Sequence, residues 1–194
     1  MKNNILKKSF YRQPTMEIAR QLLGKFLCRK VNGKLYIGKI VETEAYLGAK
    51  DLACHASKGM TERNKAMFGP AGHAYVYFIY GMYHCLNVVT EKENNPCAVL
   101  IRALEPVRTI LPPDKSGSEG ILNGPAKLCR EFKIDKEFNN WDLIIRKKLW
   151  LENGEIIKPS QIKKSKRIGV DYAGIWKNRL LRFYIKDSEF ISGK

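Results

Sequence analysis

The chain has 194 residues, of which 44% are hydrophobic, and its 35 basic against 19 acidic residues give a net charge of +16 and a pI near 9.7. This length and composition fit one globular domain that can bury a sizeable core. The excess positive charge lies in residues 1–50 and 141–194 and suits a polyanionic partner, either nucleic acid or an anionic membrane surface.

No segment has the character of a membrane span or a secretory signal. The longest apolar stretch, Ala74 to Val89, is shorter than the roughly 20 residues that a bilayer requires, and it contains His84 and Asn87. Its many aromatic and β-branched residues are typical of strands. The N-terminus has no apolar core of a signal peptide. We therefore expect a protein of the cytosol or nucleoid that does not bind membranes.

The cysteines do not form a metal-binding pattern. They are odd in number, their spacings are unrelated and there is no C-x-x-C pair, at Cys28, Cys54, Cys85, Cys97 and Cys129. Free cysteines in a reducing compartment behave as small buried hydrophobic residues. We expect neither a metal nor another cofactor.

The first predicted elements are a helix and a β-hairpin. Apolar spacing predicts a helix from about Met16 to Leu23, with Thr15 as its N-cap and Gly24 at its end. Strands are then predicted at residues 26–31 and 35–46, joined by a tight turn at Asn32-Gly33, a dipeptide that tolerates positive φ.

Two carboxylates lie on the second of these strands. Because side chains alternate along a strand, Glu44 and Tyr46 share a face and can line the same hollow. Glu42 shares that face too, so only its position along the strand distinguishes it from Glu44.

The middle and end of the chain predict an antiparallel meander and a few further elements. Residues 47–72 are polar and irregular, and strands are expected at residues 74–80, 83–90 and 98–104. A flexible loop is expected at 112–120, a helix from Pro125 to about Phe132 and a strand near 181–185. The basic run at 163–167 is either a solvated loop or a phosphate contact.

Several blocks together resemble one enzyme family. After Glu44 come His55, the aromatic run at 75–83, Asn87 and the segment Arg102-Ala103-Leu104-Glu105-Pro106. In this order and at these distances the chain resembles the alkyladenine (3-methyladenine) DNA glycosylase family. Further matches extend the resemblance from about Gln21 to the end, at Asn64, Met67-Phe68, 123–129, 172–174 and 181–184.

The resemblance implies the fold. It predicts one α+β domain over residues 1–194, with a curved antiparallel sheet, surrounding helices and a protruding β-hairpin. This is not the fold of a helix-hairpin-helix glycosylase.

The resemblance also implies two catalytic residues. Glu44 matches the general base that deprotonates a water for attack on the sugar C1′, and Arg102 matches a residue that holds this water and a nearby phosphate. Glycosidic cleavage passes through an oxocarbenium-like state, so a carboxylate near C1′ stabilises the cation and orients the water. No lysine matches a Schiff-base nucleophile, so we expect a monofunctional enzyme that does not cut the strand.

The remaining matched residues bind the base and the DNA. Tyr46, His55 and Tyr77 match three rings that sandwich the flipped base, and such a cage attracts a cationic alkylated purine. Asn87 matches a side chain that obstructs the amino group of guanine, and Leu100 matches an apolar residue of the pocket wall. Tyr80 matches a wedge that enters the minor groove, with Met82 as a neighbouring contact.

The expected substrate is duplex DNA with 3-methyladenine, 7-methylguanine, hypoxanthine or ethenoadenine, and the expected state is a monomer. Two alternatives remain at this point. One is a non-enzymatic module that stacks single strands on exposed aromatic residues. The other is a cysteine hydrolase that pairs a thiol with His55, His73 or His84.

Overall fold

A computed structural model describes residues 4–79, 81–108 and 122–193, and within these ranges the chain is an α+β fold built on one antiparallel sheet. The predicted fold class is confirmed. The predicted loop at 112–120 and Tyr80 lie outside the described residues. The strands are β1 (Phe26–Val31), β2 (Lys34–Leu47), β3 (Ala74–Ile79), β4 (Tyr83–Thr90), β5 (Cys97–Arg108), β6 (Leu149–Glu152), β7 (Ile162–Ser165) and β8 (Arg182–Ile185).

The helices are short. The α-helices are α1 (Lys8–Tyr11), α2 (Thr15–Gln21) and α3 (Pro125–Glu131), and the 3-10 helices are η1 (Gly48–Lys50), η2 (His55–Lys58), η3 (Lys65–Phe68), η4 (Lys136–Phe138), η5 (Pro159–Gln161) and η6 (Gly174–Asn178). In the region predicted to be irregular, 47–72, Leu47 ends β2, and the 3-10 helices η1, η2 and η3 follow.

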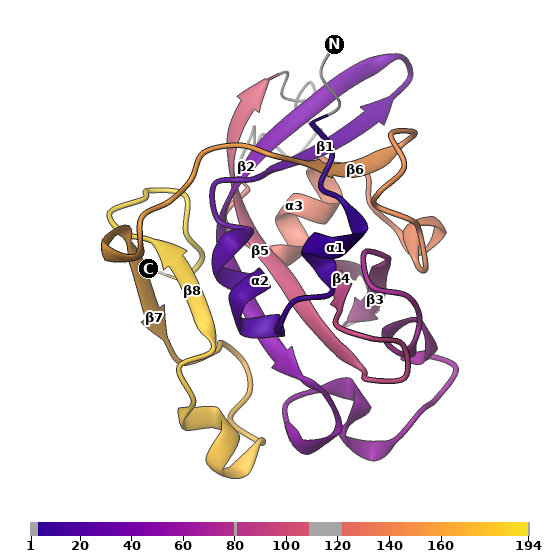
Figure 1. Ribbon diagram of the computed structural model, residues 1–194, viewed down its shortest axis with the longest axis vertical. Helices are drawn as coiled ribbons and strands as arrows, with labels where there is room; N and C mark the ends of the chain where they lie inside the picture. The colour runs from indigo at the N-terminus through magenta and orange to yellow at the C-terminus, as the bar shows by residue number, and fades with distance from the viewer. Residues whose placement is uncertain (1–3, 80, 109–121, 194) are drawn as a thin grey trace.

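The long strand β2 organises the sheet (Figure 1). The strand order is β3-β4-β5-β2-β1-β6, and β8 joins it by pairing with β2 on one side and β7 on the other. The second half of β2 therefore lies between two strands: Glu44 is opposite Leu100 of β5 and opposite Arg182 of β8.

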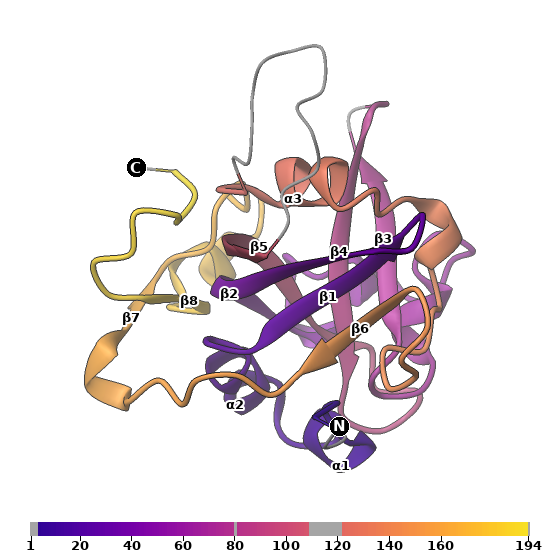
Figure 2. The ribbon, with the colours of Figure 1, turned by 90° about the horizontal axis from the view of Figure 1, so that it is seen from above.

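Helices cover both faces of the sheet. In Figure 2, α1 and α2 lie below the sheet and α3 lies above it. The Thr43 hydroxyl donates to the Ala19 carbonyl of α2 at 2.7 Å, so this residue faces the α2 side. Because side chains alternate, Glu42 and Glu44 face the opposite side, where α3 and the β3–β4 hairpin lie.

Most local predictions hold to within a few residues, but α1, β6 and β7 were not predicted and the role of Thr15 needs a correction. At the β1–β2 turn Asn32 and Gly33 have φ of 49° and 78°, as a tight hairpin turn with two positive φ angles requires. Thr15 is not the N-cap of α2 but its first residue, because its hydroxyl is engaged by Thr90 and Glu91.

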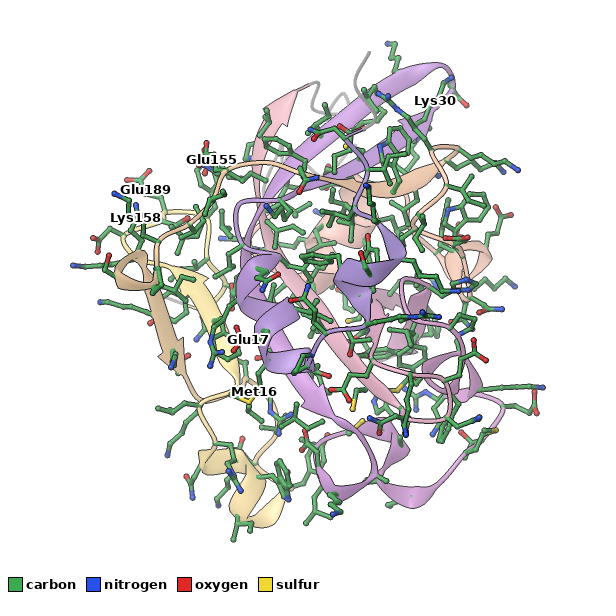
Figure 3. All side chains as sticks on the ribbon, viewed as in Figure 1. Met16, Glu17, Lys30, Glu155, Lys158 and Glu189 are labelled. Carbon is green, nitrogen blue, oxygen red and sulfur yellow. The ribbon has the colours of Figure 1, made fainter. Side chains whose placement is uncertain are left out.

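The surface is charged and the apolar stretch is internal. Charged side chains such as Lys30 and Lys158 point outward (Figure 3). The stretch Ala74–Val89 forms β3 and β4, and the five cysteines are free and buried, as predicted. Among the residues that the structure describes, no helix is long and apolar enough to cross a membrane.

Candidate active site

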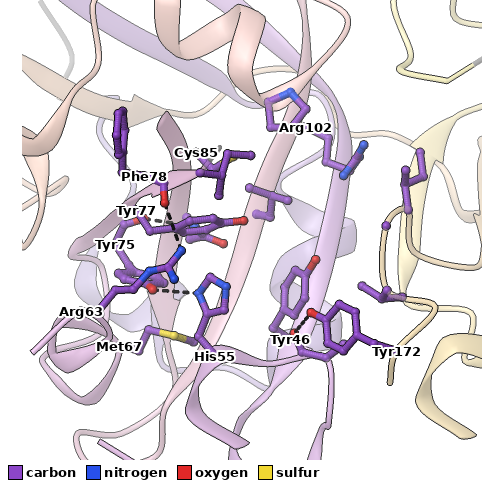
Figure 4. A pocket seen from close by; sticks show the side chains of 18 residues that line it. Tyr46, His55, Arg63, Met67, Tyr75, Tyr77, Phe78, Cys85, Arg102 and Tyr172 are labelled. Atoms are coloured by element: carbon purple, nitrogen blue, oxygen red, sulfur yellow. Dashed lines mark hydrogen bonds between the residues drawn. The ribbon is translucent and has the colours of Figure 1, made fainter. Parts of the chain in front are cut away.

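A cavity of about 520 Å³ opens on the face of the sheet opposite α2 (Figure 4). Its walls come from the end of β2, the loops after it, the β3–β4 hairpin, β5, the start of α3 and residues 168–172. The lining residues are Tyr46, Ala53, His55, Arg63, Met67, Tyr75, Tyr77, Phe78, Ile79, Cys85, Asn87, Leu100, Arg102, Pro125, Ile168, Gly169, Val170 and Tyr172. The five predicted base-binding residues are all among them.

Aromatic rings stand on two sides of this cavity. Tyr46 lies across it from His55 and Tyr77 (Figure 4). The last two rings pack edge to face, with centroids 4.5 Å apart and an interplanar angle of 83°. His55 Nδ1 is 2.9 Å from the hydroxyl of Tyr75, which fixes the imidazole in place. A flat ligand can therefore lie between Tyr46 on one side and the His55–Tyr77 pair on the other.

The imidazole of His55 favours its neutral form. Burial lowers its pKa, and the guanidinium of Arg63 lowers it further. Arg63 is exposed, and its Nη2 donates to the Phe78 carbonyl at 3.0 Å. At neutral pH His55 is therefore an uncharged ring that does not repel a cationic base.

Glu44 lies behind the cavity wall and not in it. Its side chain is fully buried, with 0% exposure, so the expectation that Glu44 and Tyr46 line the same hollow is correct only for Tyr46. The Tyr46 hydroxyl donates to Oε2 at 2.8 Å and the Ile168 amide donates to Oε1 at 2.8 Å. Arg102 Nη1 completes this set at 3.3 Å from Oε1. All three partners of Glu44 line the cavity.

The neighbouring carboxylate of Glu42 faces a different environment. It accepts from Arg182 Nε at 2.6 Å, from Arg102 Nε at 3.1 Å and from both the amide and the hydroxyl of Ser192. Of these partners, only Arg102 lines the cavity. The two carboxylates share a strand face, and tertiary contacts make Glu44 the one adjacent to the cavity.

Arg102 shares this face with Leu100, which lies two residues before it in β5, and it occupies a β-bulge. In the β2–β5 ladder Glu42 pairs with Ala103 and Thr43 pairs with Ile101, so Arg102 has no partner opposite it. Burial alone would lower the pKa of the Arg102 guanidinium, but Glu44 and Glu42 raise it above its usual value. Arg102 therefore remains a fixed cation at the cavity wall.

A buried ion pair that the sequence did not predict holds the loop that reaches Glu44. Arg167 binds Asp51 through two contacts of 2.5 and 2.8 Å, and both side chains have 0% exposure. Arg167 also donates to the Ala45 carbonyl at 2.9 Å and lies 4.7 Å from the centre of the Tyr46 ring. Ile168 follows directly, so this pair fixes its amide against Glu44.

The ion pair also corrects the reading of the basic run at 163–167. Ile162–Ser165 forms the strand β7 and Arg167 is buried, so the run is not the solvated loop that was one of the two expectations. Asp51 carried no signal in the sequence. The block at 172–174, which matches the family, was the nearest sign that this loop belongs to the site.

The other predicted residues separate into two groups. Asn87 and Leu100 are buried in the cavity wall, and the Asn87 amide donates to the Tyr75 carbonyl at 3.1 Å. Met82 is instead 64% exposed in the turn of the β3–β4 hairpin and is not one of the lining residues. It lies next to Gly81, where the projecting hairpin turns (Figure 2). Tyr80, the other predicted DNA-contacting residue, lies outside the described residues.

The thiols do not favour nucleophilic catalysis. Burial raises the pKa of Cys54 and of Cys85 to about 11, so at neutral pH both are protonated and weakly reactive. Cys85 lines the cavity. These environments argue against the cysteine hydrolase alternative.

Comparison with known proteins identifies the family of the chain. The profile of the methylpurine-DNA glycosylase family matches residues 9–189. The chain is 49% identical to a protein of Methanocella arvoryzae over 97% of this chain and 96% of that one, and 50% identical to one of Legionella pneumophila (strain Corby) over 96% and 97%. It is 47% identical to a protein of Carboxydothermus hydrogenoformans over 98% and 100%. The name of each relative refers to a 3-methyladenine DNA glycosylase. With a family match over nearly its whole length, the chain belongs to the methylpurine-DNA glycosylase family.

Proposed function

We propose that this protein extrudes a damaged purine from duplex DNA and hydrolyses its N-glycosidic bond, leaving an abasic site. The substrates are 3-methyladenine, 7-methylguanine, hypoxanthine and ethenoadenine. The cavity supports this reaction because it offers ring faces on two sides and a carboxylate behind one wall. In this proposal the protein acts as a monomer, and residues 1–194 serve as one glycosylase domain.

The observation that carries the proposal is the position of Glu44. Its carboxylate is one hydrogen bond away from three cavity-lining groups, whereas Glu42 shares only Arg102 with the cavity. In the reaction a water oxygen attacks C1′, the bond from C1′ to the purine nitrogen breaks with its electron pair going to the purine, and Glu44 accepts the water proton. Because the carboxylate is closed off from solvent, the water must take the place of one of its present partners.

Arg102 also contributes to the attack of water on C1′. Its guanidinium is at the wall and carries a permanent charge, so it can hold the attacking water and a phosphate of the extruded nucleotide. Two fixed charges of opposite sign then orient the water between them. Such preorganised groups lower the barrier without reorganising during the reaction.

Base selection follows from the rings and from Asn87. Tyr46, His55 and Tyr77 stack on the extruded purine, and a neutral His55 lets the cage accept a cationic base. Asn87, which is buried in the cavity wall, obstructs the amino group of a normal guanine. Tyr80 is the wedge that enters the minor groove, with Met82 as a neighbouring contact.

The test is replacement of Glu44 by Gln. Duplex oligonucleotides with one hypoxanthine are incubated with excess protein, and abasic sites are scored after alkali. We expect Glu44→Gln to lower the single-turnover rate by at least about 100-fold while the Kd for the duplex stays unchanged.

Glu62→Gln is the matched control, because the Glu62 side chain is 92% exposed and does not line this cavity. We expect wild-type rates for this control. Undiminished release by Glu44→Gln would remove Glu44 from the mechanism. Wild-type protein that binds single strands but releases no base would instead support the non-enzymatic module.

A further inference from the structure

A second buried polar cluster lies behind Arg102, on the side away from the cavity. This cluster, called here the Glu42 cluster, consists of Glu42, Arg102, Arg182 and Ser192. Its members come from β2, β5, β8 and the C-terminal segment. All four are buried, and three of them do not line the cavity.

Ser192 connects the members of the Glu42 cluster. Its amide donates to Glu42 Oε2 at 2.6 Å, and its hydroxyl donates to Glu42 Oε1 at 2.9 Å. The same hydroxyl accepts from Arg102 Nε at 3.2 Å and from Nη2 at 3.1 Å. Arg182 Nη2 donates to the Ser192 carbonyl at 2.7 Å. One serine near the C-terminus thus contacts the carboxylate and both guanidinium groups.

These contacts determine the direction of the remaining Arg102 nitrogen. A guanidinium is planar, so fixing Nε and Nη2 also fixes where Nη1 points. The Glu42 cluster holds Nε and Nη2, and Nη1 is then 3.3 Å from Glu44 Oε1. The charges also balance, because two carboxylates and two guanidinium groups are buried together. Pairing of this kind offsets the cost of removing charges from water.

We infer that Ser192 and Glu42 are positioning residues of the reaction, which hold the Arg102 guanidinium in register with Glu44 without touching the substrate. This inference rests on the glycosylase activity proposed above. It gives Ser192, which does not line the cavity, a part in the reaction that takes place there. It also gives the two strand-face carboxylates different tasks: Glu44 faces the water, and Glu42 holds the arginine.

The primary test is Ser192→Ala, assayed for hypoxanthine release under single-turnover conditions. We expect the rate constant to fall about tenfold, the range for losing a hydrogen bond to a charged group, with an unchanged Kd for the duplex. Glu42→Gln removes the anionic partner of two arginines and is expected to lower the rate further. Ser165→Ala is the matched control. The Ser165 hydroxyl accepts a hydrogen bond from Arg182 Nη1 at 3.5 Å and does not contact Arg102. The rate constant of this variant should therefore equal that of the wild type.

A double-mutant cycle separates positioning from simple stabilisation. In the background of Arg102→Met there is no guanidinium to orient, so adding Ser192→Ala should change the residual rate by less than about twofold. A loss in that background as large as in the wild type would overturn the inference, and so would wild-type rates for Ser192→Ala. Failure of the wild-type protein to release hypoxanthine would instead overturn the proposed function.

Discussion

Removal of the Arg167 side chain tests how the loop that reaches Glu44 is held. In Arg167→Met the Asp51 carboxylate loses both of its buried guanidinium contacts. Breaking a buried ion pair by removing one partner costs about 3 to 5 kcal/mol. Asp51 keeps the amides of Leu47 and Ala53 as donors, so we expect a cost near the lower end, about 3 kcal/mol. For a chain of this size that lowers Tm by about 6 to 12 °C.

The same change should affect catalysis separately from stability. The Ile168 amide lies next to Arg167 and donates to Glu44, so a loosened loop should also lower the single-turnover rate at temperatures where the variant is folded. Differential scanning calorimetry gives Tm, and hypoxanthine release gives the rate. The double variant Asp51→Leu with Arg167→Met removes both charges and should regain most of the lost Tm, because replacing a buried pair by apolar groups is often close to neutral. A Tm for Arg167→Met within about 2 °C of the wild type would refute the reasoning.

Three further predictions concern the wall of the cavity, the charge of the protein and its thiols. Tyr46→Phe keeps the ring but removes the hydroxyl bond to Glu44, so we expect a rate loss of about 2- to 10-fold, whereas Tyr46→Ala should cost much more because stacking is also lost. Binding to duplex DNA, measured by fluorescence anisotropy, should weaken by more than about tenfold between 50 and 200 mM salt, because phosphate contacts release counterions. An affinity that does not change with salt would contradict DNA as the partner. Cys54 and Cys85 should resist iodoacetamide in the native protein at pH 7.5, because thiols with a pKa of about 11 carry little thiolate at that pH. Labelling should rise as the pH approaches that pKa, and rapid labelling at neutral pH would contradict the prediction.

Local sequence signals predicted most of the fold. The hairpin at Asn32-Gly33, the strands β1 and β4 and the helix that starts at Pro125 agree with the structure to within a residue or two. These elements depend on neighbours in sequence: turn residues that accept positive φ, period-two burial and a proline at a first helical position. The error at Thr15 has a tertiary cause, because Thr90 and Glu91, some 75 residues away, engage the hydroxyl that would have capped the helix.

Much of the site could also be predicted from the sequence, because the blocks that resemble the family and the alternation of side chains along strands point to the same residues. Tyr46, His55, Tyr77, Asn87, Leu100 and Arg102 all line one cavity. The polar residues that hold these cavity-lining side chains in place were not predicted. Asp51, Ser192 and Arg182 act through partners far along the chain, and Arg167 sits in a run of basic residues that is typical of a solvated surface.

The sequence by itself determined that Glu42, Glu44 and Tyr46 share one face of β2, because side chains alternate along any strand. Only the tertiary structure decided which carboxylate adjoins the cavity. The Ile168 amide reaches Glu44 across 124 residues of chain, and the Ser192 amide reaches Glu42 across 150. Arg102, at the bulge in the β2–β5 ladder, contacts both carboxylates. Such contacts depend on how strands and loops close on one another, and so they arise from packing and not from the local pattern that forms each strand.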